Sequence, residues 1–270
     1  MSRPNSLALS DHLASQCHTL SFTSVRFAIG AILVVGILAL SANTAFAAEI
    51  LTNGNFEAGN FTGWFGATEN SSGPASAYYT RTYPSNTPIS NQATASNASG
   101  GTTFAVSDQN ISQASTLYQN FTLAGASPSV ILSYDMFVNN GGPTVVNNTG
   151  TLDANSPAPN AYARVDILAN GANPFTSSSG ILRNFYIGAD GGARPNAYTH
   201  YSFDITNLVG GGAGTYTLRF AEINNQGFVI NQGVDNVSIA STPEPASLSL
   251  AAMAGIVLMS RRRKTMQPGT

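Results

Sequence analysis

Apolar residues follow two different patterns along this chain. Between residues 48 and 241 they alternate with polar residues, or form short β-branched and aromatic runs bounded by Gly, Asn and Pro. Both arrangements are typical of β-strands. No segment of this region shows the repeat of an amphipathic helix, whereas a longer apolar run lies near each end of the chain. The pattern predicts an all-β domain flanked by two apolar segments.

Within the central region the alternation predicts eight strands. They cover residues 102–106, 116–123, 130–138, 162–168, 182–187, 197–205, 215–223 and 233–239. Short strands separated by turn residues indicate an antiparallel β-sandwich, and the jelly roll is the expected topology. The Asn-, Ser- and Gly-rich connections at 85–101, 139–160 and 170–180 are expected to be solvated loops, where such folds also bind ligands.

The N-terminal apolar run has the form of a signal peptide. Arg26 precedes the run, and Ala45-Phe46-Ala47 after it matches the small-x-small site of signal peptidase. We expect cleavage after Ala47, so that residues 1–47 are a leader and residues 48–241 the β-sandwich domain. The long stretch before Arg26 is either an upstream translation start or an unstructured part of the leader.

The C-terminal apolar run stands between two short polar motifs. Pro243, Glu244 and Pro245 precede it, and the prolines favour an extended, accessible backbone because they lack amide donors and fix φ. The run is shorter than the roughly 20 residues that span a bilayer comfortably. It still predicts a marginal transmembrane helix whose flanking cations reach the cytoplasmic headgroups. These cations are Arg261, Arg262, Arg263 and Lys264.

Residues 242–264 resemble the PEP-CTERM sorting signal of Gram-negative bacteria, and residues 265–270 form a short tail after it. The resemblance implies an exported protein that stops transiently in the inner membrane. It also implies cleavage near the Pro-Glu-Pro motif by an exosortase-type membrane protease, followed by attachment at the cell surface or outer membrane, or release. The alternative is an ordinary C-terminal anchor that is never cut.

The charges of the central domain restrict its partners. Residues 48–241 contain five arginines, no lysine and eleven acidic residues, which gives a net charge of about −6. An acidic domain without a basic stripe is a poor nucleic-acid binder. The single cysteine, Cys17, lies in the leader, so the domain has no disulfide option.

The two ends of the domain carry a second resemblance. Asn53-Gly54-Asn55-Phe56-Glu57 with Gly63-Trp64 opens it, and Gly233-Val234-Asp235-Asn236-Val237-Ser238-Ile239 closes it. Together they are similar to galactose-binding-like jelly rolls, which include many carbohydrate-binding modules. The resemblance implies that the first and last strands lie side by side. It also implies a structural Ca²⁺ held by Glu57 and Asp235, with carbonyl groups near Asn53 or Asn55. The alternative is that the two acids only cap turns or accept backbone hydrogen bonds.

Aromatic residues provide candidates for sugar stacking. Tyr78, Tyr79 and Tyr83 lie in a polar stretch where there is little core for them to join, although a satellite cluster is the alternative. Trp64, the only tryptophan, follows a glycine beside the first strand and is expected to fill the core with its N–H bonded to one partner.

Strand 162–168 alternates strictly enough to assign its faces. Tyr162, Arg164 and Asp166 share one face, which is predicted to be solvated or concave. Arg219 in strand 215–223 can share that face. In the modules that the domain resembles, such a face binds glycan hydroxyls through bidentate hydrogen bonds. A plain exposed ion pair between Arg219 and Asp166 is the alternative.

Few residues of the domain suggest catalysis. His200 is its only histidine, and no Gly-x-Ser-x-Gly, His-Glu-x-x-His or phosphate-binding glycine motif is present. A carboxylate pair such as Asp166 with Glu222 leaves a glycoside hydrolase as an alternative. The sequence favours a non-enzymatic surface or matrix protein that binds polysaccharide. The rival is a structural or adhesion protein with a protein partner, associating through edge strands.

Overall fold

A computed structural model describes residues 47–69, 78–96, 101–109, 111–188, 192 and 194–242. These residues belong to one compact unit, Ala45–Glu244. The predicted signal peptide core, the Pro-Glu-Pro motif and the basic cluster lie outside the described residues. Among the residues that are described, no helix is both long and apolar enough to cross a membrane.

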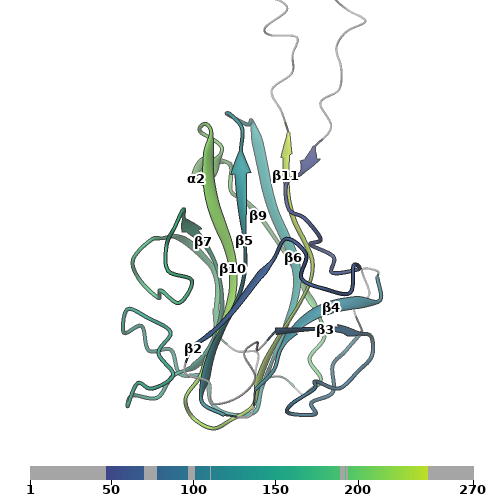
Figure 1. Cartoon of the computed structure of the whole chain (residues 1–270), viewed down its shortest axis with the longest axis vertical. Helices are drawn as coiled ribbons and strands as arrows, with labels where there is room; N and C mark the ends of the chain where they lie inside the picture. The colour runs from purple at the N-terminus through teal and green to yellow at the C-terminus, as the bar shows by residue number, and fades with distance from the viewer. Residues whose placement is uncertain are drawn as a thin grey trace, which may run out of the picture. The chain divides into compact units, whose positions relative to one another are not determined.

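The described chain folds into two antiparallel β-sheets that pack face to face (Figure 1). The six-stranded sheet has the order β3-β4-β11-β6-β9, and β1 also pairs with β11. Its strands are β1 (Ala48–Glu49), β3 (Tyr78–Thr82), β4 (Thr103–Ser107), β6 (Ser129–Asn140), β9 (Thr199–Asp204) and β11 (Ile230–Thr242). The five-stranded sheet has the order β2-β5-β10-β7-β8. Its strands are β2 (Phe65–Glu69), β5 (Gln113–Leu123), β7 (Ala161–Ala169), β8 (Ile181–Gly188) and β10 (Gly214–Asn224).

All eight predicted strands are present, so the predicted β-sandwich is confirmed. They correspond to β4 through β11, with ends that differ from the predicted ones by a few residues. The three other strands, β1, β2 and β3, span only two to five residues. A single helical turn, α2 (Thr206–Val209), was also not predicted, because four residues are too few to show a helical repeat.

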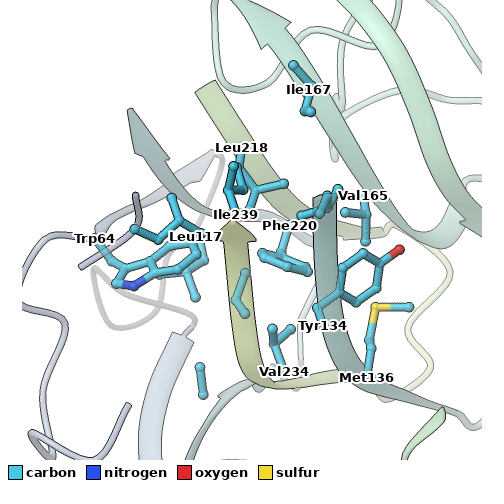
Figure 2. Packing of buried hydrophobic residues seen from close by; sticks show 14 of the residues in the cluster. Trp64, Leu117, Tyr134, Met136, Val165, Ile167, Leu218, Phe220, Val234 and Ile239 are labelled. Carbon is cyan, nitrogen blue, oxygen red and sulfur yellow. The ribbon is translucent and has the colours of Figure 1, made fainter. Parts of the chain in front are cut away.

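The core lies between the inner faces of the two sheets. Figure 2 shows how Leu218 and Phe220 of β10 approach Tyr134 and Val234 of the opposite sheet. Trp64 closes this core beside β2, is only 5% exposed, and donates its Nε1–H to the carbonyl of Asn53 at 3.1 Å. The predicted role of Trp64 is therefore confirmed. Each fully buried apolar side chain of this kind stabilises the fold by roughly 1.5–3 kcal/mol.

The first and last strands of the described chain are neighbours, as the second resemblance implied. Ala48 pairs with Ser241, and Glu49 pairs with Ala240. The loop that follows β1 also packs tightly on β11, because Val237 N–H donates to the Gly54 carbonyl at 2.9 Å. A Cβ atom on Gly54 would lie 1.8 Å from the Val237 carbonyl oxygen, so only glycine fits there.

Candidate functional site

Strand β7 presents two chemically different faces, as its alternation predicted. Ala163, Val165 and Ile167 point into the core between the sheets. Arg164 and Asp166 point to the opposite side, which is the outer face of the five-stranded sheet. Arg219 reaches this outer face from β10, where it is the direct cross-strand partner of Asp166. The sequence therefore placed these three charged side chains on the correct face.

The charged residues of this face form one buried hydrogen-bond network. Arg164 holds both carboxylate oxygens of Asp166, with Nε–Oδ2 and Nη2–Oδ1 distances of 2.8 Å. Arg219 donates to Asp166 Oδ2 through Nε at 3.1 Å and also through Nη2. Asn184 Nδ2 adds a bond of 2.9 Å to Asp166 Oδ1. Arg219 and Asp166 have no exposed surface at all. The prediction of a solvated or concave face is therefore wrong for these residues.

Two loops explain this burial. Arg219 Nη1 donates to the carbonyl oxygens of Pro174 and Thr176, both at 2.7 Å, and so fixes the loop after β7 over the sheet. Further along the same face, loop residues Leu152 and Ala154 pack on an outward-facing apolar patch. This patch consists of Ala114, Tyr162, Ala221 and Ile223. The connections at 139–160 and 170–180 are thus covering layers and not merely solvated loops.

The pKa of Asp166 reflects this arrangement. Burial alone would raise it, but the hydrogen bonds from Arg164 and the charge of Arg219 outweigh burial and lower the pKa. Asp166 therefore stays ionised and paired. We call this region the covered half: Ala114, Thr116, Tyr162, Arg164, Asp166, Arg219, Ala221 and Ile223.

The cover ends part of the way along β5. Its outward-facing residues change from fully buried at Ala114 and Thr116, through half-buried at Tyr118, to exposed at Asn120 and Thr122. Phe65 of β2 lies directly beside Tyr118 in the register. Its ring is 56% exposed and stacks on that of Tyr118 with centroids 5.6 Å apart and planes at 27°. An exposed, stacked aromatic pair therefore marks the border of the cover.

Uncharged polar side chains continue the exposed surface beyond the aromatic pair. Thr217 Oγ1 donates to Asn120 Oδ1 at 2.7 Å, and the hydroxyl groups of Thr122 and Thr215 lie 3.0 Å apart. We call the exposed surface the open strip: Phe65, Tyr118, Asn120, Thr122 and Thr215. The open strip was not predicted from the sequence, because Trp64 was the aromatic residue considered in this segment. If Trp64 is buried beside a strand, however, alternation already places Phe65 on the opposite face.

Two of the three tyrosines predicted to stack on sugars have other roles, and sugar stacking by Tyr79 stays a prediction. Tyr78 is only 2% exposed, belongs to the main core and donates its hydroxyl to Gln232 Oε1 at 2.7 Å. Tyr83 stacks on Phe104 at 4.5 Å and joins a satellite cluster on the six-stranded sheet. Tyr79 is half-buried on β3. The polar sequence around these tyrosines predicts little contact with a core, but the pairing of β3 with β4 brings Tyr78 into the core.

The four predicted calcium ligands already have protein partners. Glu57 accepts hydrogen bonds from the backbone N–H groups of Thr102 at 2.7 Å and Thr103 at 2.8 Å, which lower its pKa. Asp235 accepts a bond of 2.8 Å from the Tyr83 hydroxyl, and the backbone carbonyl of Asn53 accepts the Trp64 Nε1–H at 3.1 Å. The side-chain oxygen of Asn55 accepts the backbone N–H of Glu57. Among the described residues no group of three or more His, Cys, Asp or Glu is placed to hold a metal ion. Calcium binding at these residues stays a prediction.

The carboxylate pair considered for glycoside hydrolysis is divided between two faces. Glu222 of β10 accepts a hydrogen bond of 2.6 Å from Ser107 of the opposite sheet, so it points into the interior. Asp166 points to the outer face. Two acids on opposite sides of one sheet cannot flank the same glycosidic bond. His200, the histidine of the domain, lies on the six-stranded sheet, where its Nδ1 is 2.7 Å from Asp135 Oδ1.

The chain was compared with known proteins. No family model and no curated protein matches it. Among solved structures it is similar to TmCBM61, described in complex with β-1,4-galactotriose, with 12% identity, a TM-score of 0.43, and coverage of 71% of this chain and 97% of the other. It is also similar to a non-crystalline cellulose specific carbohydrate-binding module, CBM28, with 13% identity, a TM-score of 0.38, and coverage of 71% and 95%. A family 11 carbohydrate-binding module from Clostridium thermocellum gives 10% identity, a TM-score of 0.35, and coverage of 72% and 96%.

Proposed function

We propose that this protein is an exported, non-enzymatic protein that binds carbohydrate at the cell surface or in an extracellular polysaccharide matrix. The observation that carries the proposal is the open strip, where Phe65, 56% exposed and stacked on Tyr118, borders uncharged hydroxyl and amide groups. An aromatic ring offers an apolar surface to a sugar ring, and neighbouring neutral groups can bond its hydroxyls. The open strip combines both.

Binding is favoured over turnover by the state of the acidic residues. Asp166 is held by two arginines, and the carboxyl group of Glu222 faces the interior. Asp135 and Asp235 are buried and bonded to His200 and Tyr83 respectively. General acid–base catalysis needs a carboxyl group within reach of a substrate proton, and none of these four is exposed.

The ends of the folded unit support the proposed export route. Strand β1 begins at Ala48, directly after the predicted signal peptidase site, and β11 ends at Thr242, directly before Pro243. The described strands thus begin and end directly beside the two predicted processing sites. The proposed partners are signal peptidase, an exosortase-type membrane protease and, transiently, the inner membrane.

Replacing Pro243, Glu244 and Pro245 with alanines in the full chain tests the sorting signal. We expect the variant to stay in the membrane fraction with its tail attached, while the unchanged protein reaches the cell surface or medium with a lower mass. Mass spectrometry of both fractions measures this. Export of the triple variant at normal mass would contradict the sorting proposal.

A protein partner is the second candidate function, favoured by one surface. Strand β8 is the edge of the five-stranded sheet and, among the strands that the structure describes, pairs with β7 alone. It exposes two large apolar side chains, Leu182 and Ile187, each 41% accessible. An exposed edge strand with apolar side chains is suited to pairing with another chain.

Retention on insoluble polysaccharides separates the two candidate functions. The unit Ala45–Glu244 contains every strand described here and its own core, so it can be purified by itself. We expect it to be retained by at least one glycan of a panel that includes the exopolysaccharide of the producing cells. No retention on any glycan, together with concentration-dependent self-association in sedimentation experiments, would favour the protein-partner function.

A further inference from the structure

The open strip contains no acidic side chain and no histidine, lysine or arginine. The outward-facing residues beyond the aromatic pair are Asn120 and Thr122 on β5, and Thr215 and Thr217 on β10. From this composition we infer that the open strip takes a neutral polysaccharide and excludes acidic ones. The inference rests on the proposed function and adds to it the class of sugar and the residues that contact it.

The aromatic border of the strip provides one continuous apolar surface. The rings of Phe65 and Tyr118 stack with their planes inclined by 27° and their centroids 5.6 Å apart, and these two residues are cross-strand partners on the outer side of the sheet. Phe65 is the most exposed large apolar residue of the described chain. A sugar ring whose C–H groups cover Phe65 removes this apolar area from water. Phe65 therefore contributes the main binding contact.

The polar part of the strip offers hydrogen bonds without charge. Asn120 uses its side-chain oxygen to accept a bond from Thr217, which leaves the Nδ2 amide as a donor. The hydroxyl groups of Thr122 and Thr215 share one bond and keep further capacity as donor and acceptor. From Tyr118 to Thr122 the strip extends about 13 Å along β5. Such a surface fits a short segment of a chain rich in hydroxyl groups.

The open strip offers no basic side chain to bind the charged groups of an acidic polysaccharide. Recognition of carboxylate or sulfate groups normally uses arginine or lysine, and the domain has no lysine. The two arginines on this face, Arg164 and Arg219, are buried and bonded to Asp166. The net charge of about −6 for residues 48–241 also repels a polyanion. Binding to a neutral chain, in contrast, is expected to change little with salt.

Binding of the unit Ala45–Glu244 to a neutral β-glucan, a neutral β-galactan and alginate tests this inference. We expect retention on a neutral glycan, equal at low and high salt, and none on alginate. Phe65→Ala is expected to weaken that retention about tenfold, the usual cost of removing an aromatic binding residue. Asn120→Ala is expected to weaken it about threefold, since it removes one uncharged hydrogen bond. Phe228→Ala is the matched control, because Phe228 is also exposed, at 37%, but follows β10 outside the strip.

The outcomes separate the inference from the proposed function. Neutral binding that Phe65→Ala leaves unchanged, in a variant with the melting temperature of the unchanged unit, overturns the inference while the proposed function stands. Salt-sensitive retention on alginate overturns it as well. If the unchanged unit binds no glycan at all, the proposed function fails, and the inference fails with it.

Discussion

The covered half and the open strip occupy the same strands but have opposite chemistry. Along β5 and β10 the covered half carries Thr116 and Arg219 under two loops, whereas the open strip carries Asn120 and Thr215 in contact with solvent. The charged side chains of the covered half, which were predicted from the sequence to bind a ligand, are buried. The uncharged side chains of the open strip, which were not predicted as a site, are in contact with solvent.

This difference shows how the loops decide the role of a residue. Strand alternation sends Arg219 and Thr217 to the same side of β10. The carbonyl groups of Pro174 and Thr176 then accept hydrogen bonds from Arg219 and fix a cover over it. A buried charge that is fully bonded to a covering loop stabilises that loop, while a ligand site needs side chains that remain exposed.

The largest expected effect follows from removing Arg219, one of the two arginines of the covered half. Arg219→Met keeps the length of the side chain but leaves Asp166 with a single arginine and frees the loop carbonyls of Pro174 and Thr176. Breaking a buried pair in this way costs about 3–5 kcal/mol. For a domain of this size the melting temperature should fall by roughly 10 °C.

Thermal and urea unfolding measure the effect of Arg219→Met. Arg183→Met provides the matched control. Arg183 lies exposed on the neighbouring strand β8 with its guanidinium 5.0 Å from the centre of the Phe185 ring, and its loss should change stability by no more than about 1 kcal/mol. If both variants unfold alike, the buried network does not hold the cover. Glycan binding of Arg219→Met should survive at temperatures where it remains folded, because the open strip is unchanged.

A second buried acid, Glu222 on the inner side of β10, is expected to behave in the opposite way to Asp166 on β7. Burial raises the pKa of Glu222 well above its usual value, and its one bond to Ser107 does not compensate. The neutral form is thus favoured in the folded state. The resulting stability is complete below the unfolded pKa of about 4.3, and is lost as pH rises toward the folded pKa. Asp166, with its lowered pKa, instead loses stability as pH falls.

Glu222→Gln separates these two contributions. The amide keeps a neutral acceptor for Ser107, so the variant should lose the decline in stability above about pH 4.3. At neutral pH we expect it to be more stable than the unchanged unit by roughly 1 kcal/mol, the lower limit for relieving an unsatisfied buried polar group. Urea unfolding from pH 4 to 9 gives the comparison. Parallel stability curves for both proteins would show that Glu222 does not titrate in this range.

The sequence predicted the sandwich better than it predicted the site. Alternation is a local property, so β7 and its two faces were found from residues 162–168 alone. Whether Arg164 is exposed to solvent or covered by a loop depends on contacts with residues far away in the chain. A local sequence pattern therefore cannot predict its burial. The two-residue strand β1 exists only because β11 lies beside it, which is again a long-range effect. The outward position of Phe65 could have been predicted from the same alternation, because the neighbouring Trp64 was predicted to lie in the core.

Metal removal is expected to have the smallest effect. The backbone N–H groups of Thr102 and Thr103 already satisfy the Glu57 carboxylate, and Tyr83 bonds that of Asp235. A cation at this set would have to displace these donors, so we expect EDTA or added calcium to shift the melting temperature by no more than about 1 °C. A bound ligand raises the stability of a fold only to the extent that it occupies its site. Magnesium at equal ionic strength is the control for screening of surface charges by the added salt. A calcium-induced rise that Glu57→Ala and Asp235→Ala both abolish would establish the predicted calcium site, and would mean that these two side chains exchange their protein partners for the metal.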